Sequence, residues 1–139
     1  MLVFASFTYG HTPSRAPEQF AGCYEVTSLS WDPPDNKIKL IPNRFELLNT
    51  PVRNNEFKIH SLRAGPYESQ FEKRWSWSPK GKNKLKISWS TGLGGFYGTL
   101  HKSSNGDLAG TLKEWCDSRC GWKKETGDFH IRRTACPPN

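Results

Sequence analysis

Histidines and cysteines are the residues of this sequence best suited to acid–base catalysis, metal binding or disulfide formation. The positions of the histidines do not favour a catalytic role. His60 and His130 fall opposite the apolar residues of the strands expected around them, so both should face away from the core. No serine occupies a nucleophile-elbow motif, no two histidines form a paired motif, and no close pair of carboxylates appears. The sequence therefore indicates no catalytic residues and no cofactor, and an enzyme remains open only if its site is assembled in three dimensions.

The spacing Cys116-Asp-Ser-Arg-Cys120 could supply half of a metal site. A zinc site needs four ligands, usually as two close pairs, and no second cysteine or histidine pair lies nearby. We therefore expect no metal here, and instead a small disulfide loop between Cys116 and Cys120. An even total of 4 cysteines fits two disulfides and an oxidising compartment, so we expect an extracytoplasmic protein, periplasmic or secreted. The apolar residues 1–7 are too short for a signal peptide, so this expectation depends on the cysteines.

Aromatic residues that alternate with polar ones are the main candidates for a ligand-binding site. Trp75 and Trp77 fall on one side of an expected strand, and Trp89 takes the same side of the next strand. Such side chains either fill a core or line a cavity, and the N–H group of a buried tryptophan needs an acceptor, which a ligand or a water can supply. The full set of candidates is Phe45, Phe57, Phe71, Trp75, Trp77, Trp89 and Phe96.

Lys73 falls between Phe71 and Trp75 on the same side of that expected strand. A charge on an apolar side is costly unless it is paired or lies near the rim. Lys73 is therefore expected either to meet a ligand carboxylate at the mouth of a barrel or to be turned outward by a strand irregularity.

The elements that would position these residues are short strands separated by turn signals. Period-two alternation and β-forming residues predict eight strands, at residues 23–31, 44–48, 56–62, 70–78, 84–90, 96–101, 108–115 and 128–135. The dipeptide Asn105-Gly106 is a strong hairpin signal. No segment has a convincing helical pattern, so the fold is predicted to be all-β.

Consecutive strands with short loops pair antiparallel, and eight of them can close into an up-and-down barrel; a two-sheet sandwich is the alternative. Residues 1–20 are expected to be a flexible tail and residues 21–139 a single domain. Closure makes the first and last strands neighbours, which brings Cys23 beside Cys136 and predicts a disulfide between them. A barrel of this size can be filled by side chains or hold one small ligand.

The segment Gly22-Cys-Tyr24 resembles the start of a lipocalin-like, or calycin, barrel, in which Gly-x-Trp on the first strand packs against an arginine on the last. Tyr24 would stand in the tryptophan position, and Arg132 or Arg133 in the arginine position. The chain is similar to small bacterial lipocalin-like proteins in Gly22-Cys-Tyr-Glu, in the Trp-Ser-Thr-Gly ending at Gly92, and in Arg-Arg-Thr-Ala-Cys136. This resemblance implies a ligand-binding barrel with no catalytic residues to carry over.

The formal net charge of +7 can favour anionic partners, although the basic residues are spread along the chain rather than gathered in a block. No apolar run is long enough for a membrane span. We expect a monomer that binds a small hydrophobic or amphipathic molecule inside the barrel, with an anionic one such as a fatty acid favoured by the charge. The alternatives are a nucleic-acid or carbohydrate module with a basic aromatic face, of which nucleic acid is the less expected, and a barrel-cavity enzyme such as an isomerase or cyclase.

Overall fold

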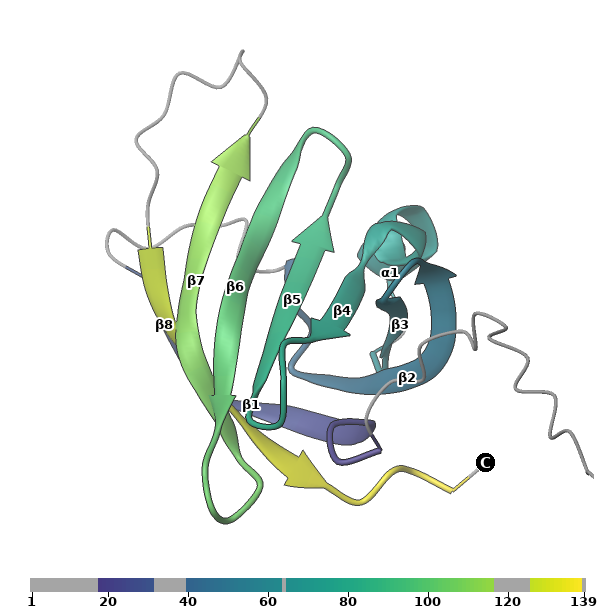
Figure 1. The fold of residues 1–139 in the computed structure, drawn as a ribbon. Coiled ribbons are helices and arrows are strands. Elements are labelled where there is room, and N and C mark those ends of the chain that lie inside the picture. The colour runs from purple at the N-terminus through teal and green to yellow at the C-terminus, as the bar shows by residue number, and fades with distance from the viewer. Residues whose placement is uncertain (1–17, 32–39, 64, 117–125, 139) are drawn as a thin grey trace, which may run out of the picture.

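The computed structural model of the protein describes residues 18–31, 40–63, 65–116 and 126–138 (Figure 1). Its strands form one closed antiparallel barrel in which each strand pairs with the next and β8 returns to β1. The predicted up-and-down barrel is therefore confirmed, and the sandwich alternative is wrong. The strands are β1 (Gly22–Trp31), β2 (Arg44–Arg53), β3 (Glu56–Ser61), β4 (Ser76–Pro79), β5 (Lys84–Ser90), β6 (Gly94–Lys102), β7 (Leu108–Cys116) and β8 (Thr126–Thr134).

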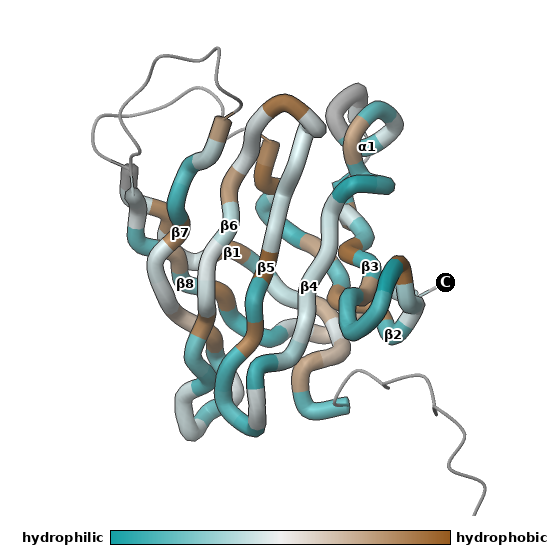
Figure 2. Tube along the Cα trace, turned by 45° about the horizontal axis from the view of Figure 1, so that its top comes forward, coloured by the Kyte–Doolittle hydropathy of each residue, from teal (hydrophilic) through white to brown (hydrophobic). Residues whose placement is uncertain are grey.

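Strand β5 shows how the sequence pattern builds the barrel wall. Leu85, Ile87 and Trp89 are buried, whereas Lys84 and Lys86 are exposed. Hydrophobic and hydrophilic residues accordingly alternate along this strand (Figure 2). Successive side chains of a strand point to opposite faces, so the apolar set fills the barrel and the lysines coat its outer wall.

Closure of the barrel joins its first and last strands. Strand β1 pairs with β8 over most of its length, and Cys23 lies opposite Thr134. The Cys23–Cys136 disulfide forms just beyond that pair, with Cα atoms 5.2 Å apart. The predicted pairing of these two cysteines is therefore confirmed.

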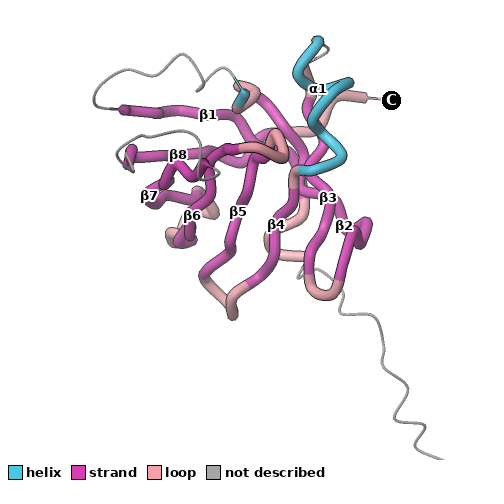
Figure 3. Tube along the Cα trace, turned by 90° about the horizontal axis from the view of Figure 1, so that it is seen from above, coloured by secondary structure: helices cyan, strands magenta, loops and turns pink. Residues whose placement is uncertain are grey.

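Two helical turns replace the first part of the strand predicted at residues 70–78. The chain forms α1 (Pro66–Phe71) and the 3₁₀ turn η2 (Glu72–Arg74), and becomes extended again at Trp75. The prediction of no helix is wrong because Phe71 and Trp75 are four residues apart, a spacing that suits one turn of helix as well as one face of a strand. Proline in the first turn of α1 also favours helix initiation. Seen from above, α1 lies beside β3 and β4 at one end of the barrel (Figure 3).

The chain differs from prediction at two other places. Strand β2 continues through Pro51 to Arg53, with irregular register on both sides of the proline. Proline has no N–H to donate and is tolerated where strand pairing is irregular. Residues 1–17 of the predicted tail lie outside the described residues, but Phe20, at its end, is fully buried and packs edge-on against Trp77. Phe20 therefore belongs to the core and closes the end of the barrel opposite α1.

Candidate functional site

The barrel interior holds most of the aromatic residues that the sequence marked as ligand-binding candidates. Phe45, Phe57, Trp75, Trp77, Trp89 and Phe96 are each 0–1% exposed and belong to one core cluster. The ring of Trp89 meets those of Phe45 and Phe129 edge-on, with centroids 5.4 Å apart in both pairs. These rings pack against one another, so they form much of the core as well as the wall of any internal site.

Phe71 and Lys73 lie elsewhere, because the helical turns change their orientation. Phe71 is half-buried and packs against the core from α1. Lys73 is exposed on η2 and lines a groove on the outside of the barrel. Lys73 therefore does not share a strand face with the interior tryptophans, and of its two expected placements the outward one is correct.

The interior tryptophans differ in how their indole N–H groups are satisfied. Trp77 Nε1 donates to the Leu48 carbonyl oxygen at 3.0 Å. In contrast, Trp75 Nε1 and Trp89 Nε1 are buried and have no acceptor among the described residues. An unpaired buried donor costs about 1–3 kcal/mol, so an acceptor from outside the described residues would stabilise each of these N–H groups.

The register places these donors next to each other. Ser76 lies opposite Ser88, so continuing the β4–β5 register by one residue puts Trp75 opposite Trp89. Trp89 in turn lies opposite Phe96, and Phe96 opposite Glu114. We name Trp75, Trp89, Phe96 and Glu114 the inner row. It runs from Trp75, directly before β4, across β5, β6 and β7, near the end of the barrel at which α1 lies.

Glu114 is the inner-row residue that sequence reasoning missed. It is only 3% exposed, and it shares the inward side of β7 with Leu112. The alternation of Leu108, Leu112 and Glu114 was the available signal, since it places a carboxyl group on the apolar side of the strand. The inner row therefore combines indole donors and a carboxyl group within an aromatic interior.

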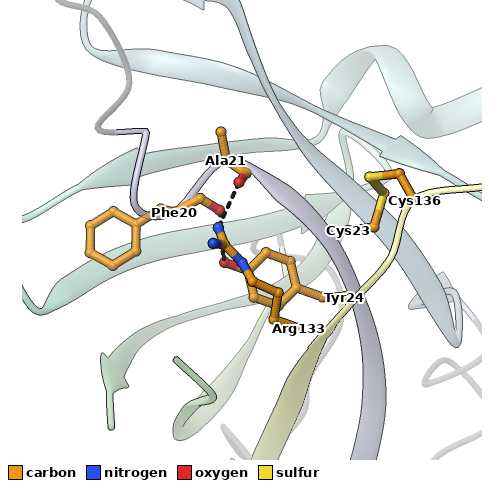
Figure 4. Close-up of a disulfide and its surroundings, with 6 residues drawn as sticks. All are labelled: Phe20, Ala21, Cys23, Tyr24, Arg133 and Cys136. Atoms are coloured by element: carbon orange, nitrogen blue, oxygen red, sulfur yellow. Dashed lines mark hydrogen bonds between the residues drawn. A yellow bond between two sulfur atoms is a disulfide. The ribbon is translucent and has the colours of Figure 1, made fainter. Parts of the chain in front are cut away.

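The opposite end of the barrel is closed around Tyr24 and Arg133 (Figure 4). Arg133 Nη2 donates to the carbonyl oxygens of Ala21 and Gln19, at 2.6 and 3.0 Å. The Tyr24 hydroxyl donates to the Phe20 carbonyl at 2.8 Å. Burial raises the pKa of Tyr24, and the neighbouring Arg133 charge partly opposes that shift. Arg132 instead pairs with Glu25, so Arg133 is the arginine that contacts Tyr24.

A groove on the outer wall of the barrel has a volume of about 900 Å³. Ser76 and Ser78 of β4, and Ser88 of β5, line it, and they alternate with the inward tryptophans. The groove therefore lies on the outside of the barrel. Its charged and aromatic lining comprises Arg53, Glu56, Lys73, Arg74, Trp77, Lys80, Lys86, Tyr97 and Trp115. We name this hollow the outer groove.

The remaining cysteines give no metal centre in the part of the chain that can be described. Cys116 is disulfide-bonded, and its expected partner Cys120 lies outside the described residues. Cys23, Cys136 and Glu46 lie close enough to share an ion, but both sulfurs are consumed in the disulfide. Neither group therefore offers the free thiolates that a zinc site uses.

Comparison with known proteins gives no assignment: no protein-family model, curated protein or solved structure matches the chain. The class is set by the fold alone, as a closed eight-stranded antiparallel β-barrel. Among the described helices, none is long and apolar enough to cross a membrane.

Proposed function

We propose that the protein is a lipocalin-like carrier that holds a small, largely apolar molecule against the inner row. The observation that carries this proposal is the pair of buried indole N–H groups on Trp75 and Trp89 without an acceptor among the described residues. A carbonyl, ether or hydroxyl oxygen on the ligand would accept from one or both, while its apolar body packs on the surrounding rings.

The inner row favours a neutral polar group on this ligand. Glu114 brings a buried carboxyl group to the same row as the two donors. An ionised ligand carboxylate would lose its hydration on entering this largely aromatic interior, which is costly unless the charge is paired. We therefore favour an alcohol, ketone or ester over the fatty acid that the net charge suggested.

The closed end of the barrel supports the lipocalin-like part of the proposal. Tyr24 takes the expected tryptophan position and meets Arg133 from the last strand. Gly22, two residues before Tyr24, has a φ of 140°, and an added Cβ there would lie 3.4 Å from Arg133 Nη2. The disulfide is compatible with an extracytoplasmic, bacterial protein of this kind, whose ligand would enter at the opposite end.

Binding of a defined probe panel tests the proposal. Dodecan-1-ol, dodecanoic acid and retinol would be titrated into the full chain by calorimetry. We expect the neutral probes to bind more tightly than the acid. Trp89→Phe, which keeps a ring but removes the N–H, should weaken binding about tenfold, the equivalent of one hydrogen bond.

Trp115→Phe is the matched control, because Trp115 lines the outer groove rather than the interior. It should leave the affinity of the neutral probes unchanged. Absence of binding across the panel, or equal losses in Trp89→Phe and Trp115→Phe, would show that the interior is a core and not a ligand site.

A further inference from the structure

We propose that the outer groove binds an anionic polysaccharide chain, at a site separate from the barrel interior. Its lining includes five cationic side chains, from Arg53, Lys73, Arg74, Lys80 and Lys86, and one acidic residue, Glu56. The segments that contribute them, the β2–β3 hairpin, η2 and the β4–β5 hairpin, converge on the outer wall.

The positive charge of the outer groove is largely uncompensated. Glu56 accepts from Arg53 Nε at 2.6 Å, which neutralises one cation. The other four cations have no acidic partner within the described residues. Like charges gathered in one hollow raise the free energy of the unbound protein, and an anionic ligand relieves that cost.

The outer groove is held in shape by its strands and by Arg74. An added Cβ on Gly92 would lie 3.1 Å from the Arg74 guanidinium carbon, so this side chain packs directly over the turn that joins β5 to β6. The serines between the cations sit on β4 and β5, and Ser76 and Ser78 are only 7% and 9% exposed. A ligand would therefore meet a floor of fixed hydroxyl groups with cations around it.

The distribution of charge favours an extended ligand over a single small anion. Arg74 precedes β4, and Lys80 follows it. At about 3.3 Å per residue of extended chain, the run between these two cations is roughly 20 Å long. Lys86 lies opposite Ser78, and so adds a cation between the two ends. Charges spread over this length suit a chain of repeated anionic units.

The uncharged lining favours sugars over nucleic acid. Serine hydroxyls donate to and accept from sugar hydroxyls, and Tyr97 and Trp115 offer two ring surfaces on one side of the outer groove. Trp115 lies opposite Gly95, which has no side chain to cover it. Single-stranded nucleic acid is bound on platforms where successive bases stack on aromatic rings, whereas the lining here is mostly serine and cation. The Cys23–Cys136 disulfide also fits a compartment where polysaccharides abound.

Affinity measurements with polymers of defined charge test this inference. The folded chain would be titrated with dextran sulfate, alginate, uncharged dextran and a thymidine oligonucleotide. We expect the two anionic polysaccharides to bind and uncharged dextran not to bind. Which of the two binds more tightly distinguishes a sulfate from a carboxylate preference. Tighter binding of the oligonucleotide would overturn the proposed class.

A pair of charge variants separates the outer groove from the overall charge. Lys80→Ser with Lys86→Ser should weaken polysaccharide binding at least tenfold and reduce its salt dependence. The control is Lys82→Ser with Lys84→Ser, which removes the same charge from exposed positions on the same hairpin that do not line the outer groove. Equal effects of the two variants would show that the binding reflects net charge and would reject the site.

Removal of a ring provides a second, charge-independent test. Tyr97→Ala should weaken polysaccharide binding several-fold at high salt, where the lysine variants lose most of their effect. An unchanged affinity would contradict the aromatic part of the site. Neutral apolar probes of the interior should bind all these variants as tightly as they bind the original protein. A failure of polysaccharide binding at the outer groove can therefore be distinguished from a failure of the proposed carrier function.

Discussion

The guanidinium carbon of Arg133 lies 5.6 Å from the ring centroid of Tyr24, and Arg133 Nη2 is 3.4 Å from the Tyr24 hydroxyl oxygen. The two residues lie opposite each other in the β1–β8 pairing that closes the barrel. The same guanidinium also donates hydrogen bonds to the backbone carbonyl oxygens of Gln19 and Ala21, the residues on either side of Phe20. One side chain thus links the last strand, the first strand and the turn that closes this end of the barrel.

Replacing this arginine should therefore destabilise the fold. Arg133→Gln removes the cation from the Tyr24 ring and two hydrogen bonds to the turn, and we expect it to lower the free energy of unfolding by about 1–2 kcal/mol. Urea unfolding followed by tryptophan fluorescence measures the change. Arg132→Gln, which breaks only a partly exposed ion pair, should cost less than about 1 kcal/mol. Equal costs in the two variants would contradict the role assigned to Arg133.

The disulfide should contribute strongly to stability because it spans most of the domain. Cys23 and Cys136 are 113 residues apart, and in the chain-entropy description a loop of this length contributes about 4–5 kcal/mol. Cys23→Ser with Cys136→Ser should therefore lower the free energy of unfolding severalfold more than Arg132→Gln does. Cys116→Ser with Cys120→Ser is the comparison, since the disulfide that the sequence predicts between them would close a short loop and contribute about 2 kcal/mol. A larger loss in that second variant would contradict the dominant role of the closing disulfide.

Glu68 should make the α1 end of the barrel sensitive to acid. Its buried side chain accepts from Arg63 Nε at 2.8 Å and from Ser61 Oγ at 3.1 Å. Desolvation acts to raise the pKa of Glu68, but these hydrogen bonds and the Arg63 charge outweigh it, so the pKa is lowered from 4.5. A lowered pKa means that the stabilisation is present above the ordinary pKa and is lost as pH falls through the folded-state value.

Glu68→Gln should therefore be less stable than the original protein at pH 7, and the difference should shrink below about pH 4. Thermal unfolding at pH 7, 5 and 3 measures it. Glu56→Gln, on the partly exposed ion pair of the β2–β3 hairpin, should change stability little at any of these values. A Glu68→Gln deficit that stays constant down to pH 3 would contradict the ionised, hydrogen-bonded state assigned to Glu68.

The strands and the closing disulfide could be predicted because each depends on a local pattern or on connectivity. Residues 84–90 alternate cleanly, and β5 has these bounds. The α1 turn was missed because Phe71 and Trp75 satisfy helical and extended periods alike, and contacts of Glu68 with Ser61 and Arg63 decide between the two. The pattern of apolar and polar residues within one segment carries no information about contacts with residues outside that segment.

The candidate sites were predicted unevenly for a similar reason. The inward tryptophans follow from alternation, but which of their N–H groups lacks an acceptor depends on a backbone carbonyl of another strand: Leu48 accepts from Trp77, and no described residue accepts from Trp75 or Trp89. The outer groove draws its cations from separate segments and depends on how the strands coil, so the spread of basic residues in the sequence gave no sign of it.

The indole N–H signals of Trp75 and Trp89 test the central claim most directly. In ¹⁵N-labelled protein, assigned by Trp75→Phe and Trp89→Phe, titration with dodecan-1-ol should shift one or both of these signals downfield and slow their exchange with solvent. The signal of Trp115, on the outer wall, should stay in place. Unmoved signals of Trp75 and Trp89 at saturating dodecan-1-ol and retinol, with Trp115 shifting instead, would contradict a ligand site inside the barrel.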